Sequence, residues 1–410
     1  MPLLSVEQAR ERILSHFQPV TTEKIKLTHC ANRVLATDIV AADDLPFFDN
    51  SSMDGFALRA ADSSNAAPAS PLTLRVVADI PAGSTPTVSL APGQAARIMT
   101  GAQIPAGADA VIPVEDTDFN DRSAGTPPPE TIAITRPVHA GENVRPRGMD
   151  VRSSDVILKA GVRLNPQSVG ILAMLGFAEV DVYKHPRVAL LSSGDELLEV
   201  GAPLESGKIR DSNTSMLAAL VQSTNAEVIR LGIAKDTRES VTNLLEEAVK
   251  QNVDVILTSA GVSVGAFDYV KEVVESNGSL NFWRVNMRPG KPLAFGEYKN
   301  IPFIGLPGNP VSAFVGFEVF VRNTLERLGG LSDGGRQTVR VRCEEEILSD
   351  GRESYLRAVV YEKDGQYSAR LTGHQGSGNL LSLVQANALL IIPAGVKCVP
   401  AGQEVNAWLL

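Results

Sequence analysis

The sequence predicts a multidomain protein of α/β and β class, centred on a three-layer α/β domain with a mostly parallel sheet. Its 410 residues exceed what one hydrophobic core normally organises, so we expect several domains. Residues 178–330 alternate strand-like apolar runs with helical patterns, which predicts parallel strands covered by helices on both faces. The segments on either side carry short apolar runs between turn residues, as β-rich domains do.

The first part of the chain predicts a discontinuous domain with an insertion. Ser5 and Gln8 can form a capping box at the start of an amphipathic helix, and a short strand follows before residue 45. Residues 46–139 read as the inserted β-rich domain. Residues 140–177 end in a further helical pattern, and we expect them to fold back onto residues 1–45.

The central and last parts predict two more domains. Residues 178–330 contain strands in RVALLSS, AEVIRLGIA, VDVILTS and IPFIGL, each followed by a helical pattern. The last of these helices, SAFVGFEVFVRNTLERLGG, is apolar on nearly all sides and should be deeply buried. The helix DYVKEVVESNG should end at Gly278. Residues 331–410 return to short strands, which predicts a small β-barrel or sandwich.

The composition is that of a folded, acidic protein, with 44% hydrophobic residues, 21% charged residues and a net charge of -9. This charge argues against nucleic-acid binding over the whole surface, although a local basic pocket can still hold an anion. Cys30, Cys343 and Cys398 show no metal-binding spacing, so we expect reduced thiols in a cytoplasmic protein. We find neither a signal-peptide core nor a run long enough to cross a membrane.

Acidic side chains follow the predicted parallel strands. Asp195 and Glu196 come after the first strand, Asp236 after the second, and Asp268 closes the loop after the third. The fourth strand ends in Pro307-Gly308-Asn309-Pro310, directly before a helix. Because the carboxyl ends of parallel strands face one crevice, these groups should converge beside a helix N-terminus that suits a phosphate. Carboxylates also suit Mg²⁺, so the sequence predicts a site for a phosphorylated ligand handled with a metal.

Each of these signals also has a plain structural interpretation. Asp236 with Glu239 is typical of a helix-capping pair, and Asp268 stands where an N-cap residue belongs. Glycine turns follow many strands, so little weight rests on the loop that holds Gly261, Ser263 and Gly265. It is the combination at one sheet edge that favours a functional site.

Basic residues surround a Pro-Gly turn between the third and fourth strands. Arg284, Arg288 and Lys291 lie around Pro289-Gly290, and an arginine fork suits a bound oxyanion. The alternative interpretation is a positively charged surface hairpin. Arg357, read alone, is a plain surface residue.

The β-rich domain and the C-terminal part hold less specific candidates. The polar loop DNSSMDG, with Asp54, lies between apolar anchors and predicts an ordered functional loop or, more simply, an Asx turn. Thr100 lies in a similar Thr-Gly turn, and Ser377 lies in the glycine-rich run TGHQGSGN. His374 in that run is isolated, and we interpret it as structural.

The motifs of one family occur in this chain in their family order: DNSSMDGFA, RIMTGA, SSGDEL, TSAGVSVGAFDY, MRPGKPLAFG, GLPGNPVS and TGHQGSGN. The chain resembles MoeA-type molybdopterin molybdenumtransferases over essentially its whole length, and it is similar to the E domain of gephyrin. The α/β part alone is also similar to MogA-type adenylyltransferases, which lack the N-terminal and C-terminal parts.

The resemblance implies an activity, a cofactor and partners. It implies insertion of molybdenum from molybdate into adenylylated molybdopterin, with Mg²⁺-dependent release of AMP, to give molybdenum cofactor. It implies four domains, in which 178–330 is the MogA-like molybdopterin-binding domain and 331–410 the C-terminal barrel, and an elongated homodimer. The partner subunit's β-rich domain would close the active-site cleft. An upstream molybdopterin-adenylating protein and molybdoenzyme chaperones are further expected partners, whereas nucleic acid and membranes are not.

The resemblance also assigns roles to single residues. Catalytic positions match Asp54 and Thr100 in the β-rich domain and Glu196, Asp236 and Asp268 in the α/β domain. Glu196 and Asp268 are the expected Mg²⁺ ligands. Arg357 and Ser377 border the expected oxyanion site. The expected substrate-binding positions are Gly261, Ser263, Gly265, Arg284, Arg288, Lys291, Pro307, Gly308, Asn309, Pro310, Ser312, Arg357 and Ser377.

Two departures from the family pattern bear on these roles. The family usually has lysines where Arg284 and Arg288 stand; arginine preserves the charge and favours oxyanion forks but removes any role for a titratable amine. Ala260 stands where a glycine is frequent, which is harmless if its backbone φ is negative. Neither change removes an acidic group, so the expected activity stands.

Two other functions fit parts of the sequence. A MogA-type adenylyltransferase would use ATP to activate molybdopterin, but the additional domains argue against it. A non-catalytic scaffold, in the manner of gephyrin's E domain, would tolerate the loss of Glu196, Asp268 and Arg288, whereas an enzyme would not.

Overall fold

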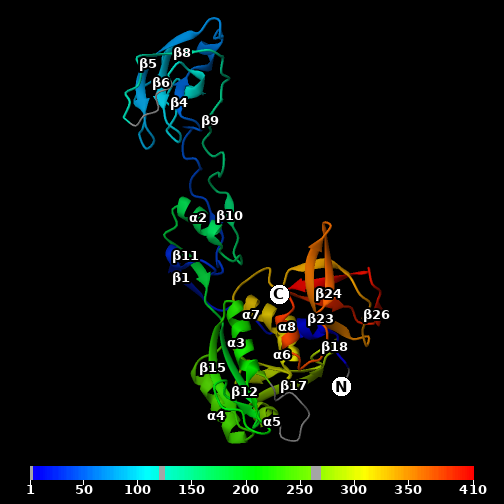
Figure 1. The fold of residues 1–410 in the computed structure, drawn as a ribbon. Helices are drawn as coiled ribbons and strands as arrows, with labels where there is room; N and C mark the ends of the chain where they lie inside the picture. The colour runs from blue at the N-terminus through cyan, green and yellow to red at the C-terminus, as the bar shows by residue number, and fades with distance from the viewer. Residues whose placement is uncertain (1–2, 120–124, 260–268) are drawn as a thin grey trace. The chain divides into compact units, whose positions relative to one another are not determined.

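The computed structural model describes residues 3–119, 125–259 and 269–410, with the backbone alone at residues 282 and 283. The chain forms two compact units (Figure 1). The first comprises Met1–Thr37, Ala160–Ala173 and Phe177–Leu410, and the second comprises Asp38–Lys159 with Met174–Gly176. The second unit is therefore an insertion in the chain of the first. Among the helices of the described residues, none has the length and apolarity needed to span a membrane.

A six-stranded mixed sheet forms the centre of the first unit. Its strand order is β15 (Glu227–Ala234), β12 (Arg187–Ser193), β16 (Val255–Ser259), β20 (Ile301–Leu306), β19 (Pro292–Tyr298) and β17 (Gly278–Arg284). The first four strands are parallel, as predicted, and the last two are antiparallel. Lys299 and Asn300, with φ of 47° and 67°, make the two-residue turn that reverses the chain between β19 and β20.

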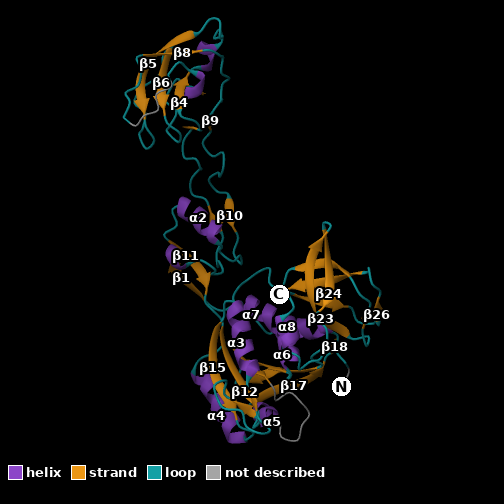
Figure 2. Ribbon diagram, in the orientation of Figure 1, coloured by secondary structure: helices purple, strands orange, loops and turns teal. Residues whose placement is uncertain are grey.

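Helices cover both faces of this sheet, as the alternating pattern predicts (Figure 2). Three helices pack on one face in a single core that also takes in the N-terminal helix: α3 (Ser212–Ser223), α6 (Pro310–Gly316), α7 (Arg322–Leu328) and α1 (Val6–Leu14). The other face is covered by α4 (Arg238–Lys250) and α5 (Tyr269–Ser276). The prediction that Gly278 ends α5 is wrong. The helix ends at Ser276, and Gly278 is the first residue of β17, opposite Tyr298.

The long apolar helix is buried, as predicted, and contains an irregular turn. A π-helical segment, η4 (Phe317–Val321), separates α6 from α7, and all five of its residues are buried. One of them is Glu318, which accepts hydrogen bonds from Arg322 and Arg336. The N-terminal helix α1, which packs in the same core, begins with the predicted capping box between Ser5 and Gln8.

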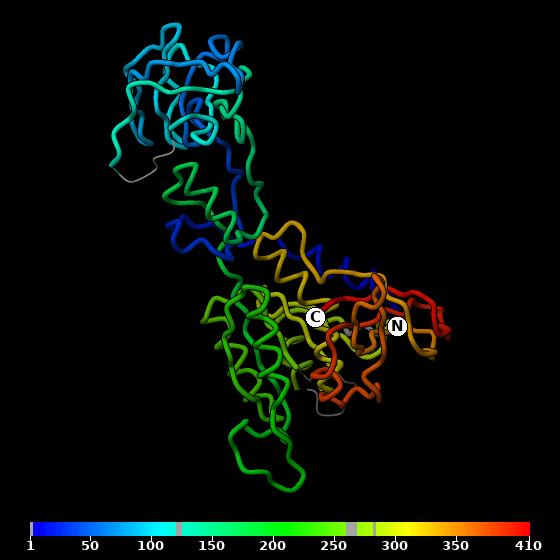
Figure 3. Tube along the Cα trace, turned by 45° about the horizontal axis from the view of Figure 1, so that its top comes forward, coloured from blue at the N-terminus to red at the C-terminus, as the bar shows by residue number. Residues whose placement is uncertain are grey.

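Short elements join the α/β part to the segments before it. Strand β1 (Thr22–Lys26) pairs antiparallel with β11 (Glu179–Tyr183), the strand that leads into β12. The 3₁₀ turn η1 (Leu27–His29) follows β1, and α2 (Pro166–Met174) precedes β11. Between β12 and α3 the chain runs out in a long loop that contains the short parallel pair β13 (Leu197–Leu198) and β14 (Ile209–Arg210) (Figure 3).

The C-terminal part of the first unit is a closed β-barrel, as predicted. The strands follow the order β23 (Glu353–Lys363), β24 (Gln366–Leu371), β21 (Thr338–Cys343), β27 (Glu404–Leu409) and β25 (Ala388–Ile392), and β25 pairs again with β23. Strand β18 (Met287–Arg288) from the α/β part pairs with β23. A minor pair, β22 (Ile347–Leu348) with β26 (Cys398–Val399), and the helix α8 (Leu381–Val384) complete it.

The second unit is β-rich, as predicted. Its main sheet has the order β7 (Ala110–Pro113), β4 (Gly55–Leu58), β6 (Gln94–Ile98), β5 (Leu72–Ile80) and β8 (Thr131–Ile134), with a separate core on each face. Two small pairs accompany it: β3 (Asn50–Ser51) with β9 (Val144–Arg145), and β2 (Ile39–Val40) with β10 (Val156–Leu158). The 3₁₀ turns are η2 (Ala60–Ser63) and η3 (Val114–Asp116).

Candidate active site

The strand order of the central sheet marks one crevice. The chain leaves β12 for β15 on one side and then returns past β12 to β16 on the other side. In open parallel sheets, ligands bind beyond the carboxyl ends of the strands at such a reversal. Polar side chains that follow β12 and β16 are therefore the first candidates for contact with a substrate.

Asp211 anchors a polar cluster beside this crevice. It is the N-cap of α3, and its carboxylate accepts hydrogen bonds from the Thr214 N–H at 3.0 Å and the Thr214 hydroxyl at 2.6 Å. The Ser192 hydroxyl of β12 also donates to it. The sequence here, DSNTS, predicts no more than a helix, so this cluster was missed. The available signal is the run of polar side chains within one first helical turn.

Asn213, in the same helical turn, connects the next two strands. Its Nδ2 atom donates to Ser259 Oγ at the end of β16 and to the Gly308 carbonyl after β20, both at 2.7 Å. Asn213 and Ser259 are both buried. The start of α3 is thus bonded to the ends of β12 and β16 and to the turn before α6.

The loops after β12 and β15 bring two of the acidic side chains together. The Asp236 N–H donates to Asp195 Oδ1 at 3.2 Å, and the Asp195 N–H donates to Asp236 Oδ2 at 3.4 Å. Asp236 does not cap α4, because the N-cap is Thr237, whose hydroxyl accepts from the Ser240 N–H at 3.2 Å. The interpretation of Asp236 with Glu239 as a capping pair is therefore wrong.

Glu196 lies in the same loop as Asp195, with its carboxylate folded back over Gly194. A Cβ atom on residue 194 would lie 2.4 Å from Glu196 Oε2, and the φ of Gly194 is +148°. The Glu196 carbonyl accepts from the Ile209 N–H at 2.8 Å. Glu196 is exposed, so its carboxylate is open to a ligand in this conformation.

These carboxylates have the donor chemistry of a magnesium site. Mg²⁺ is commonly held by one or two carboxylates together with water and substrate phosphate oxygens. Within the described part of the chain, no three acidic, histidine or cysteine side chains converge on one point. Glu196, with Asp195 in the same loop and Asp236 in the loop after β15, fits this requirement for one or two carboxylates. Four predicted residues lie outside the described residues: Gly261, Ser263, Gly265 and Asp268.

The basic turn lies against the barrel. Arg284 ends β17, and Arg288 lies in β18, where its backbone pairs with Ser354 of β23. The carbonyl of Lys291 accepts from the Val285 N–H at 2.9 Å. Across the described ranges, no carboxylate oxygen lies within 4.0 Å of the charged side-chain nitrogens of Arg284, Arg288 and Lys291. The turn is thus held by two strands and offers positive charge to a ligand.

Arg357 is a fully buried arginine in β23, so its interpretation as a surface residue is wrong. Its Nε donates to Ser382 Oγ and its Nη2 to the Gly376 carbonyl, both at 3.0 Å. Its Nη1 is buried and has no hydrogen-bond partner among the residues described. Burial, with a smaller effect of the Arg288 charge, lowers the pKa of Arg357 to about 10, so the side chain stays cationic at neutral pH. A buried cation with a free donor suits an oxyanion.

The turn before α6 contacts the glycine-rich loop of the barrel. Asn309 is the N-cap of α6, yet its Nδ2 donates to Ser377 Oγ at 3.1 Å and its side chain does not cap the helix. The Val311 N–H donates to the Ser377 carbonyl at 3.0 Å, and Pro310 at the first helical position has no N–H. This helix start is thus bonded to the barrel. The remaining predicted residues here differ in exposure, since Pro307 and Ser312 are buried and Gly308 is exposed.

In the second unit, Asp54 and Thr100 lie together. Asp54 Oδ1 accepts from the Thr100 N–H at 2.7 Å and from the Thr100 hydroxyl at 2.8 Å. Asp54 directly precedes β4, and Thr100 lies just after β6, the neighbouring strand. The structure therefore pairs the two predicted catalytic residues of the β-rich domain.

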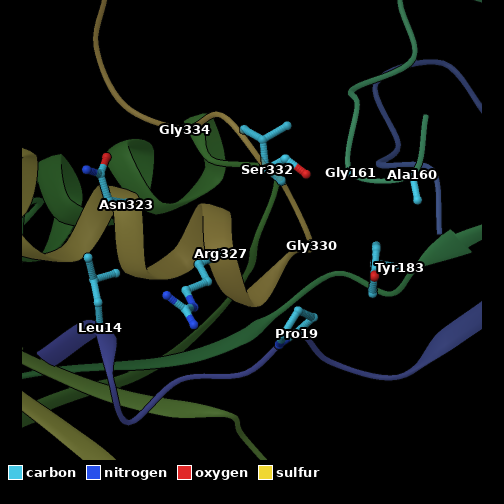
Figure 4. A pocket seen from close by; sticks show the side chains of 11 residues that line it. Leu14, Pro19, Ala160, Gly161, Tyr183, Asn323, Arg327, Gly330, Ser332 and Gly334 are labelled. Carbon is cyan, nitrogen blue, oxygen red and sulfur yellow. The ribbon is translucent and has the colours of Figure 1, made fainter. Parts of the chain in front are cut away.

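A cavity of about 500 Å³ in the first unit holds none of the predicted site residues. It lies at the end of α7, and Figure 4 shows Arg327 of that helix with Leu14, Pro19 and Tyr183 around it. Arg327 is in the last turn of α7, where a cation stabilises its own helix. Because this charge has a structural role and the switch-point crevice is elsewhere, we place the candidate site in the crevice.

Three family models match the chain: the MoeA N-terminal region (domains I and II) at residues 4–176, the probable molybdopterin-binding domain at 189–327, and the MoeA C-terminal region (domain IV) at 340–410. A molybdopterin molybdenumtransferase of Nostoc sp. is 40% identical, covering 94% of this chain and 88% of the relative. One of Haemophilus influenzae is 37% identical over 98% of both chains. The crystal structure of the molybdopterin biosynthesis MoeA protein from Pyrococcus horikoshii matches with a TM-score of 0.84, 32% identity and full coverage of both chains.

Proposed function

Since the chain belongs to the MoeA family, we propose that it is a molybdopterin molybdenumtransferase. It inserts molybdenum from molybdate into adenylylated molybdopterin and releases AMP. The observation that carries this proposal is the buried guanidinium of Arg357, whose Nη1 has no hydrogen-bond partner among the described residues, at the junction of the barrel with the turn before α6. A small tetrahedral oxyanion is the kind of ligand that such a donor suits.

The oxyanion end of the site is formed by cations from two elements. Arg357 supplies the free Nη1, and Arg284, Arg288 and Lys291 of the basic turn supply further positive charge. Ser377 is held by Asn309 and can share in binding the anion. These groups bind and orient molybdate and stabilise negative charge as it reacts.

The acidic end of the site handles the phosphoanhydride of the substrate. We assign the Mg²⁺ ligands to Glu196 and Asp268, with Asp195 and Asp236 in support. When bound, this ion would neutralise phosphate charge as AMP leaves. The chain's own part is to hold the carboxylates at the crevice between β12 and β16, where the substrate binds.

Asp54 and Thr100 complete the site from a second copy of the chain. The resemblance to the family implies a homodimer in which the β-rich part of one subunit serves the α/β part of the other. The hydrogen bonds between the exposed residues Asp54 and Thr100, which flank neighbouring strands, support a shared role. We further propose a cytoplasmic enzyme that receives substrate from a molybdopterin-adenylating protein and hands product to molybdoenzyme chaperones.

The two alternative functions are less favoured. A MogA-type adenylyltransferase would need only the α/β part, whereas the matches to MoeA models extend over both flanking regions. A non-catalytic scaffold gives no reason for a buried arginine donor that lacks a partner within the described ranges.

The test combines purified protein with adenylylated molybdopterin, Mg²⁺ and molybdate. We expect molybdate-dependent AMP release together with reconstitution of a cofactor-free molybdoenzyme. Glu196→Ala should abolish metal-dependent turnover while leaving the fold intact. ATP consumption without any need for molybdate would instead favour the adenylyltransferase. Tight binding without AMP release would favour the scaffold.

A further inference from the structure

Asn213 joins three elements of the crevice through one side-chain amide. It lies in the first turn of α3 and is 9% exposed. Both hydrogens of Nδ2 are used, one toward Ser259 Oγ and one toward the Gly308 carbonyl, each at 2.7 Å. Because a backbone carbonyl can only accept, the amide nitrogen must face Gly308, and the orientation of the amide is fixed.

The same amide leaves its oxygen without a partner. Asn213 Oδ1 is buried, and among the described residues it accepts no hydrogen bond. An unpaired buried polar group costs about 1–3 kcal/mol of stability. An apolar side chain of the same shape would avoid that cost, but it would leave the buried Ser259 hydroxyl and the Gly308 carbonyl without this donor. The amide thus fixes the turn at Gly308 against the end of β16 at the cost of one unpaired oxygen.

The bonds of Asn213 continue toward the oxyanion end of the site. The residue after Gly308 is Asn309, whose side chain donates to Ser377 Oγ at 3.1 Å. The carbonyl of the residue before Ser377 accepts from Arg357 Nη2 at 3.0 Å. One continuous run of bonded residues thus leads from the end of β16, through the turn before α6, to the buried guanidinium.

We propose that Asn213 is a positioning residue for molybdenum insertion. Its Nδ2 holds the turn before α6 in place between the substrate crevice and Arg357. This assignment rests on the proposed function. Asn213 acts through Gly308 and Asn309, not by touching molybdate. Without the bond to Gly308 the turn is free to shift, and a displacement of about 1 Å is enough to slow an enzymatic reaction about 100-fold.

Asn213→Leu tests the assignment. Leucine has nearly the same shape and removes both the Nδ2 donors and the unpaired oxygen. Gly308 is exposed, but Ser259 is buried and loses its Nδ2 partner. We therefore expect the free energy of unfolding to fall by about 1–3 kcal/mol, and rates are compared per amount of folded protein. Molybdate-dependent AMP release should fall about 10- to 100-fold, and the molybdate concentration for half-saturation should rise.

Asn387→Leu is the matched control. Asn387 Nδ2 donates to the Val360 carbonyl at 2.8 Å, and its Oδ1 accepts from the Val360 N–H at 2.7 Å, both within the barrel. Its loss should lower stability and leave molybdate half-saturation unchanged. Asn213→Asp keeps the shape but lacks the donors, so it should share the kinetic defect of Asn213→Leu.

The results distinguish a positioning role of Asn213 from a purely structural one and from failure of the proposed function. A folded Asn213→Leu protein with parent-like rate and half-saturation overturns the assignment. So does a loss of activity that only follows the loss of folded protein, since a structural role predicts that result. If the parent itself releases no AMP in response to molybdate, the proposed function fails, and the assignment fails with it.

Discussion

The carboxylate of Glu196 rests against the backbone of Gly194, two residues earlier in the chain. The space that a Cβ atom on residue 194 would need is taken by Glu196 Oε1 and Oε2, at 2.8 and 2.4 Å. The φ of +148° at Gly194 is also one that other residues rarely adopt. A glycine is therefore required where the chain leaves β12, and the proposed metal ligand owes its position to it.

Gly194→Ala should displace Glu196 and slow the reaction. We expect AMP release at saturating Mg²⁺ to fall about 10- to 100-fold, because the carboxylate no longer lies in its place. The backbone strain should also lower the free energy of unfolding by about 1–3 kcal/mol. Steady-state AMP release and urea unfolding check the two effects.

Gly365→Ala supplies the control for backbone strain. Gly365 has a φ of +74° in the turn between β23 and β24, and no atom lies within 4 Å of the added Cβ. It should lose stability without losing AMP release. If Gly194→Ala keeps parent activity at saturating and at low Mg²⁺, Glu196 is not the metal ligand.

Arg357→Lys should weaken the use of molybdate. A lysine keeps the charge but has one ammonium head, which cannot replace bonds to both Ser382 Oγ and the Gly376 carbonyl while leaving a donor free. We expect the molybdate concentration for half-saturation of AMP release to rise about tenfold, equivalent to the loss of one charge-assisted hydrogen bond of about 1.5 kcal/mol. An unchanged molybdate dependence contradicts the oxyanion role.

Arg340→Lys is the comparison for that experiment. Arg340 lies in the same barrel, but it is exposed and pairs with Glu404 at 3.5 Å on the surface. Its replacement should change neither molybdate dependence nor stability measurably.

Periodicity predicted the layered α/β part because short, mainly apolar strands alternate there with helical patterns, of which Arg238–Lys250 has one clear apolar face. It gave no sign of the antiparallel edge, since the strand that ends at Arg284 mixes polar and aromatic residues. The turn at Lys299 and Asn300 depends on positive φ, which neither residue type demands. The antiparallel direction of the edge strands therefore depends on turn geometry, which the hydrophobic pattern does not encode.

The acidic half of the site was partly predictable and the rest was not. Asp195, Glu196 and Asp236 follow strands, so topology alone predicts that they converge. Asp211 and Asn213 begin a helix, where polar residues are ordinary caps, and only the bonds to Ser192 and Ser259 reveal the cluster.

The burial of Arg357 could not be predicted from the sequence for a different reason. Its strand is buried at five consecutive positions, from Ser354 to Ala358, so alternation gives no signal of which residue is covered. An arginine in such a strand is buried only because Ser382 and the glycine-rich loop supply partners, and these lie 17 or more positions away in sequence. Pairing at that range is not encoded in local pattern.

Mixed dimers test whether two subunits share each active site. Asp54→Ala and Glu196→Ala should each abolish activity when present in every subunit. In a heterodimer of the two, one site carries both defects and the other carries neither. Random exchange at equal amounts makes half of the dimers mixed, so about a quarter of the parent activity should return. No recovery after verified subunit exchange means that Asp54 serves its own subunit.

The buried ion pair in the π-helical segment should make stability depend on pH. Glu318 is fully buried, and its carboxylate accepts from Arg322 Nε at 2.7 Å and from Arg336 Nε at 2.9 Å. Burial by itself would raise the pKa of Glu318, but the hydrogen bonds from Arg336 and Arg322 outweigh it and lower the pKa below its ordinary value of 4.5. A depressed carboxyl pKa stabilises the fold above the unfolded value and loses that contribution as pH falls through the folded one.

Glu318→Gln should therefore lower the free energy of unfolding most at neutral pH. Removing one partner of a buried ion pair leaves the arginine charges uncompensated, and we expect a loss of about 3–5 kcal/mol in the free energy of unfolding at pH 7. The difference from the parent should narrow as pH drops below 4.5, because the unfolded parent then takes up a proton at Glu318 that the folded protein binds only at lower pH. Urea unfolding at a series of pH values measures this difference.

Glu247→Gln is the control, at a surface position where the carboxylate lies 3.7 Å from Lys250 Nζ. It should change the free energy of unfolding by less than about 0.5 kcal/mol at every pH. A difference for Glu318→Gln that stays constant with pH would show that titration of the Glu318 carboxyl does not account for the loss.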